Sequence, residues 1–149
     1  MSELALGQHG WAMFLAFLGL AVAVFGVQSA IGDYGAARGY RVLLGAAAML
    51  FLAAGVFPLG ETSTVHIGAI TLAFVFAVLA MYLFPSAAGR ASVAAPRAVS
   101  WILAAGVAVS VALGQIIPIG IAQRLAAGCL LAWLVILSLR LPQQQKGKV

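Results

Sequence analysis

Five apolar runs, each about 20 residues long, occupy most of this sequence and constrain its fold more than any other feature. Runs of this length cross a bilayer core of about 30 Å as helices. Because lipid offers no hydrogen bonds, the backbone of each run must satisfy its own polar groups, which favours helices over open strands. We therefore expect an all-α polytopic membrane protein, a bundle of five transmembrane helices. The expected spans are residues 11–31, 42–59, 65–84, 98–117 and 119–141.

The shortage of charge points to the same class of protein. Only 7% of the residues are charged, whereas an average soluble domain has about 25%. Residues 1–149 are expected to form one transmembrane domain. Pro118 separates the last two spans by a few residues, which predicts a tight helical hairpin. One kinked helix over residues 98–141 is the alternative, but it would far exceed a single bilayer crossing.

Positive charge is distributed unevenly between the two sides of the predicted bundle. Seven of the eight Lys and Arg residues follow an odd number of spans, and only Arg124 lies on the other side. Loops rich in Lys and Arg stay in the cytoplasm. We therefore expect the N-terminus outside and the C-terminus in the cytoplasm. No basic stretch is rich enough to bind nucleic acid.

This threading gathers polar side chains on the outer side, where Glu61, His66, Gln123 and Arg124 form a candidate cluster. An arginine inside a span must reach the interface or find a partner. Glu61 is expected to pair with Arg124 or share a water with it. The alternative is that Arg124 reaches outward alone to lipid phosphate and Glu61 is solvated in its loop. His66 falls in the first turn of its helix, where the helix dipole disfavours a charged imidazole. A neutral ring can accept a hydrogen bond or bind a metal.

The same side chains leave few options for cofactors or catalysis. Zinc held by the two histidines and a carboxylate, or haem b held by His9 and His66, are minor alternatives, because no ligand spacing is present. No cofactor and no metal are expected. No GxSxG or Ser-Lys arrangement is present either, so no catalytic residue is assigned.

Two further groups of residues have expected roles. Gly106, Ser110 and Gly114 recur every four residues, a pattern that lets helix backbones approach closely. Packing within the bundle is favoured over a dimer contact. Arg38 and Arg41 on the cytoplasmic side are candidate contacts for lipid headgroups, or simply basic anchors beside interfacial tyrosines.

Short motifs resemble the bacterial and archaeal membrane proteins of the domain of unknown function 998 family. That family has GvFP at the end of one span, a histidine opening the next with a phenylalanine beyond it, and a last span with a glycine, a basic pair and a tryptophan. The matching residues here are Gly55, Val56, Phe57, Pro58, His66, Phe74, Gly120, Gln123, Arg124 and Trp133. The resemblance covers about Arg41 to Leu141 and implies a prokaryotic cytoplasmic membrane. The family usually has six spans, one more than this chain, and implies no activity.

The expected function is that of a small membrane protein without evident catalytic machinery. It is either an accessory subunit of a membrane complex or a lipid-binding module, so its partners are membrane lipid, other subunits or a second copy. One alternative is an oligomeric transporter or channel lined by Gln28, Ser29 and Thr71. Another is an enzyme or haem or metal protein that uses the outer cluster.

Overall fold

The structure is a computed structural model that describes residues 10–57 and 63–146. Most of these residues are helical, and none of them is in a strand. The expected all-α class is confirmed. The elements are α1 (Gly10–Ala30), η2 (Ile31–Tyr34), α2 (Arg38–Val56), α3 (Ser63–Ala87), η3 (Gly89–Ala94), α4 (Arg97–Leu113) and α5 (Ile119–Lys146). Both η2 and η3 are short 3-10 helices.

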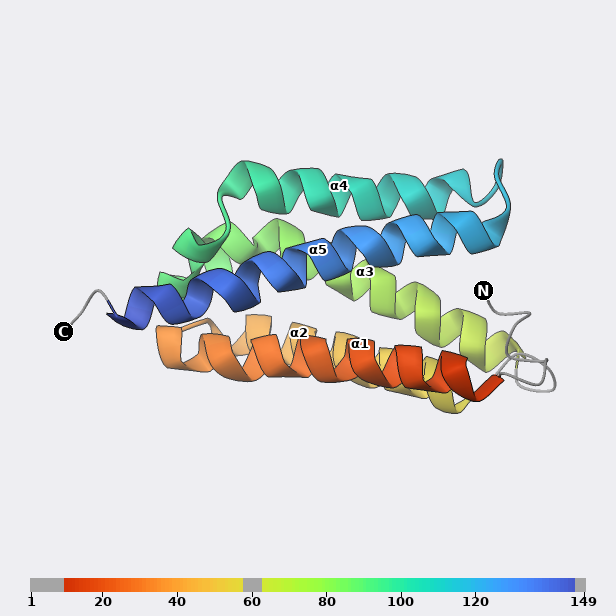
Figure 1. Cartoon of the computed structure of the whole chain (residues 1–149), viewed down its shortest axis with the longest axis horizontal. Coiled ribbons are helices and arrows are strands. Elements are labelled where there is room, and N and C mark those ends of the chain that lie inside the picture. The colour runs from red at the N-terminus through yellow and green to blue at the C-terminus, as the bar shows by residue number, and fades with distance from the viewer. Residues whose placement is uncertain (1–9, 58–62, 147–149) are drawn as a thin grey trace.

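The five long helices run alternately up and down the same axis (Figure 1). Neighbours in the chain pack on each other, so that α2 lies between α1 and α3, and α4 between α3 and α5. The contact between α1 and α5, which would close the ring, is much smaller than any of these. The bundle is therefore least tightly sealed between its first and last helices.

Most of these helices have the length and the apolar composition of membrane-spanning helices. Among the described residues, four helical segments are long and apolar enough to cross one: Trp11–Tyr34, Arg38–Val56, Ser63–Ala87 and Gly120–Leu141. Helix α4 is also apolar but has 17 residues, at the lower limit of about 17 to 25 for a span. Large apolar side chains such as Ile102 (68% exposed) and Val22 (63% exposed) point outward. This outward apolar surface indicates a multi-pass membrane protein.

Several of the expected span ends differ from the helix ends in the structure: α2 begins at Arg38 rather than residue 42, and α5 continues past Leu141 to Lys146. Helix α3 continues past Phe84 and through Pro85 to Ala87. The proline withholds one amide hydrogen bond, and the helix ends two residues later. Helix α4 ends at Leu113 rather than near Ile117. The amides of Ile116 and Ile117 both donate to the Leu113 carbonyl, which closes the chain into a turn. That turn makes α4 and α5 a hairpin, as expected, and not one kinked helix.

Aromatic side chains connect the helices in the core by hydrogen bonds and ring contacts. The Trp133 indole donates from Nε1 to Ser100 Oγ at 3.1 Å, and its ring meets Phe84 edge to face. The Tyr40 hydroxyl donates to the Ala80 carbonyl at 3.0 Å. Tyr40 is therefore a buried link between α2 and α3 and not part of an interfacial aromatic belt, which corrects one expectation for this segment.

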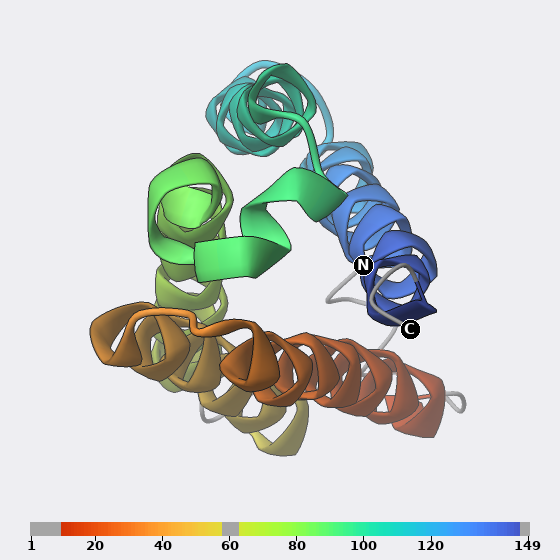
Figure 2. The same ribbon diagram turned by 90° about the vertical axis from the view of Figure 1, so that its left-hand side faces the viewer.

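The two 3-10 helices close one end of the bundle, and Figure 2 shows η3 lying across it. Four alanines of this segment, Ala88, Ala91, Ala94 and Ala95, are fully buried. Gly89 has a positive φ, and a Cβ there would lie 2.6 Å from the Gly35 carbonyl oxygen, so the two segments touch backbone to backbone. The Ala37 amide donates to the Ala87 carbonyl across the same contact.

Candidate functional site

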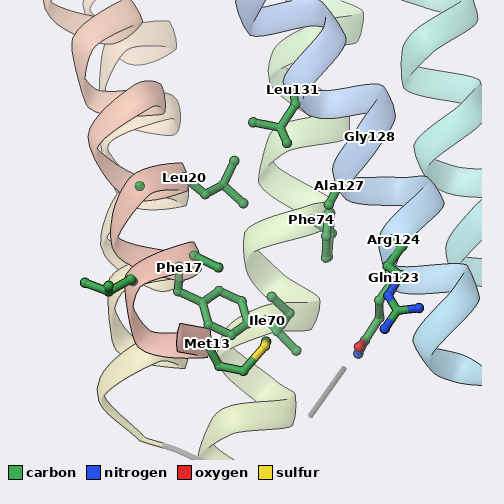
Figure 3. A pocket seen from close by; sticks show the side chains of 13 residues that line it. Met13, Phe17, Leu20, Ile70, Phe74, Gln123, Arg124, Ala127, Gly128 and Leu131 are labelled. Atoms are coloured by element: carbon green, nitrogen blue, oxygen red, sulfur yellow. The ribbon is translucent and has the colours of Figure 1, made fainter. Parts of the chain in front are cut away.

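The candidate site is a cavity of about 500 Å³ between α1, α3 and α5, which we call the groove. Its size falls within the range of about 300 to 1,000 Å³ typical of ligand pockets. Apolar side chains make most of its wall (Figure 3): Met13, Phe17, Leu20, Ile70, Phe74 and Leu131. The wall also includes Leu15, which is 51% exposed, and Leu131, which is 46% exposed. The groove therefore opens onto the outer surface between α1 and α5.

Small residues on the two helices create this space. Gly19 on α1 and Gly128 on α5 both line the groove, and a Cβ added at either would meet nothing within 4 Å. Ala16 and Ala127 add little volume beside them. Elsewhere α5 fills the core with large side chains such as Trp133 and Leu137. The groove is thus built by short side chains where α1 and α5 make only a small contact.

One end of the groove is polar. Figure 3 shows the side chains of Gln123 and Arg124 side by side at the end where Met13 and Ile70 lie, with Leu131 at the other end. Arg124 is exposed and Gln123 is half-buried. Neither forms a hydrogen bond or an ion pair within the parts of the chain that the structure describes. Within the described residues, Arg124 therefore presents an unpaired guanidinium beside an apolar cavity.

The predicted pairing of Glu61 with Arg124 is not decided by this geometry, because Glu61 lies outside the described residues. The acidic residue that the structure does describe, Asp33, belongs to η2 at the opposite end of the bundle. Of the predicted outer cluster, the structure brings Gln123 and Arg124 together on one turn of α5.

His66 has a different environment from the rest of the predicted cluster. It is 3% exposed, and its Nδ1 lies 2.8 Å from the Ala54 carbonyl oxygen and 2.9 Å from that of Phe57. Because both partners are acceptors, Nδ1 carries the proton and donates. These carbonyls belong to the C-terminal end of α2, where a helix has no further amides to bind them. His66 therefore caps α2 from the first turn of α3.

The other ring nitrogen of His66 is left without a partner. Nε2 is buried and has no hydrogen bond within the described residues. Phe17, which lines the groove, packs edge to face on the imidazole with ring centroids 5.7 Å apart. His66 thus supports the groove wall through Phe17, and it is not itself part of the lining.

The remaining predicted residues lie away from the groove. Gly106 on α4 faces α5, where a Cβ would come within 2.8 Å of Cys129 Sγ, and Ser110 is buried with its hydroxyl donating to the Gly106 carbonyl. Gly114 follows the end of α4. At the opposite end of the bundle, Arg38 is exposed, and the half-buried Arg41 packs its guanidinium against Gly32.

Apolar lining residues such as Met13, Phe17 and Leu20 were not predicted. They carry no sequence signal, because nearly every residue of these helices is apolar and only packing decides which ones face a cavity. Within the described ranges, no three His, Cys, Asp or Glu side chains lie close enough together to hold a metal ion.

Comparison with known families assigns the chain to a family, which its geometry alone does not. A family model described as "Protein of unknown function (DUF998)" matches residues 1–140. The chain belongs to this family. The match to the DUF998 family also includes α1, so it extends further towards the N-terminus than the motifs between Arg41 and Leu141. The chain matches no curated protein and no solved structure.

Proposed function

We propose that this DUF998-family protein is a non-catalytic membrane module that binds a lipid, with an acyl chain lying in the groove. In this proposal all five helices span a prokaryotic cytoplasmic membrane, with the N-terminus outside and the C-terminus in the cytoplasm. No metal or haem takes part. A single observation carries the proposal, namely an apolar cavity that opens sideways between α1 and α5.

The lateral opening matters because of what surrounds the bundle. A cavity that faces water admits soluble ligands, whereas one that opens between two lipid-facing helices is reached by molecules already in the bilayer. Ligand pockets are mostly apolar with a few placed polar groups, and the groove has this character. Filling it with an acyl chain also restores the dispersion contacts that an empty cavity lacks.

The other end of the bundle argues against a channel that runs through a single copy of the chain. A pore along the axis would have to pass η3, whose buried alanines occupy the closed end (Figure 2). Two of the expected pore-lining side chains, Ser29 and Thr71, are exposed on the outside of the bundle. The groove is therefore better suited to holding a molecule than to conducting one.

The accessory-subunit function has less support from the described residues. Small-residue helix faces suit contacts with other subunits, but Gly106 on such a face of α4 is already in contact with α5. Co-purification from native membrane separates the two functions, because a subunit retains a stoichiometric protein partner and a lipid-binding module retains lipid alone.

Filling the groove tests the proposal directly. In Gly128→Leu, the new side chain enters open space at the groove wall, and we expect bound lipid, measured by native mass spectrometry after gentle purification, to fall at least several-fold. Gly68→Leu is the matched control, because Gly68 is an exposed helical glycine with nothing within 4 Å and lies outside the groove. Both changes favour the helix by up to about 1 kcal/mol. Equal lipid retention by the two variants would contradict the proposal.

A further inference from the structure

We infer that the groove selects an anionic phospholipid, whose phosphate is held by Arg124 and Gln123 while its acyl chain lies along α1 and α5. This inference rests on the proposed function and adds the chemical class of the headgroup and the leaflet it comes from. The occupant is a lipid of the leaflet next to the α4–α5 turn.

The placement of the two polar residues sets the orientation of the ligand. Among the residues that line the groove, Gln123 and Arg124 are adjacent on α5, and their side-chain ends lie together at one end (Figure 3). Seven residues further along α5, Leu131 lines the other end. A molecule with one polar end and one apolar chain matches this division of the wall.

The chemistry of Arg124 selects the charge of the polar end. A guanidinium donates two parallel hydrogen bonds to a phosphate, and Arg is favoured over Lys at such sites for that reason. An arginine placed in a span without a partner costs free energy, which an anion offsets. The Gln123 amide adds a donor for a phosphate or ester oxygen. No acidic side chain of the described residues lies among the groove residues to compete for the guanidinium.

The length of the groove wall indicates which leaflet supplies the lipid. Arg124 lies five residues after the start of α5 at Ile119, which is about 7.5 Å along the helix. The wall from Arg124 to Leu131 then covers roughly 10 Å, most of the roughly 15 Å of hydrocarbon in one leaflet. An acyl chain whose headgroup is at Arg124 therefore fits the groove within its own leaflet, and it enters through the opening between α1 and α5.

The test compares two lipids that differ only in headgroup charge. The purified full chain is placed in nanodiscs of phosphatidylglycerol and phosphatidylcholine with identical acyl chains, and the lipids that remain bound are counted by native mass spectrometry. We expect about a tenfold enrichment of phosphatidylglycerol on the wild-type chain, which corresponds to about 1.4 kcal/mol. Arg124→Gln removes the enrichment, and Arg124→Lys, a point charge without the fork, keeps part of it.

Control variants separate this site from general electrostatic attraction. Arg140→Gln removes an exposed charge from the other end of α5, and it should leave the enrichment unchanged. Loss of enrichment in Arg140→Gln equal to that in Arg124→Gln overturns the inference. The inference is also overturned if the wild-type chain shows no preference for phosphatidylglycerol but Glu61→Gln does, because Glu61 then neutralises Arg124 in the wild-type chain.

Failure of this inference is distinguishable from failure of the proposed function. If phosphatidylcholine and phosphatidylglycerol bind equally and Gly128→Leu releases both, the groove binds lipid but does not select charge. If Gly128→Leu releases neither, the groove is not the lipid site and the proposed function fails as well.

Discussion

At the scale of single residues, several polar side chains of the described residues connect the helices by hydrogen bonds, whereas Gln123 and Arg124 do not. His66 Nδ1 and Tyr40 Oη donate to backbone carbonyls of neighbouring helices, and Trp133 donates to Ser100. A buried donor or acceptor without its partner costs about 1 to 3 kcal/mol, so these bonds fix how the helices meet. Gln123 and Arg124 form no such bond within the described residues, which leaves them available to a ligand.

Replacing His66 tests its role as a cap. In His66→Leu the carbonyls of Ala54 and Phe57 lose their donor, and we expect the free energy of unfolding in detergent to fall by about 1 to 3 kcal/mol. His66→Asn restores an N–H donor on a short side chain and should recover part of the loss. Val65→Leu, at the exposed neighbouring position, serves as the control and should change stability by less than about 0.5 kcal/mol. A His66→Leu chain as stable as the wild type would exclude the cap.

At the scale of elements, apolar run length predicts the helices because the bilayer leaves the backbone no other regular structure. Contacts between distant segments set the ends of these elements, and no local pattern reports those contacts. The η2–η3 contact is an example, because it depends on Gly89 meeting Gly35 and on the Ala37 amide finding the Ala87 carbonyl. The sequence reveals Arg124 as a charge inside a span, but it does not reveal which apolar side chains face Arg124 across the groove.

The η2–η3 contact is expected to be intolerant of any side chain at Gly89. Gly89→Ala adds a Cβ to a residue with φ of +59°, within 2.7 Å of two carbonyl oxygens. The left-handed conformation alone costs roughly 1 to 2 kcal/mol, and the overlap adds to it. We expect a thermal midpoint several degrees lower by fluorescence unfolding in detergent. Gly68→Ala, in open space on α3, should instead be neutral or stabilising by up to about 1 kcal/mol. Similar midpoints for both variants would mean that the contact does not hold the end of the bundle closed.

At the scale of the whole molecule, the two ends of the bundle differ in charge and in construction. Arg38, Arg90 and Arg97 belong to the closed end, near η2 and η3, whereas Arg124 lies near the α4–α5 turn. A bundle with basic residues concentrated at one end inserts with that end in the cytoplasm. In the proposed orientation the closed end faces the cytoplasm, and the polar end of the groove lies in the outer leaflet.

Cysteine labelling of intact cells tests this orientation. The lone native cysteine is removed as Cys129→Ser, and a single cysteine is then placed at Gln115, in the exposed α4–α5 turn, or at Ala37, exposed just before α2. We expect a membrane-impermeant maleimide to label Gln115→Cys in intact cells, and Ala37→Cys only after permeabilisation. The reverse pattern would place Arg124 in the cytoplasmic leaflet. The groove would then draw its lipid from the inner leaflet. Labelling at both positions from outside would instead mean that α2, α3 and α4 do not all cross the membrane, because three crossings would put the two positions on opposite sides.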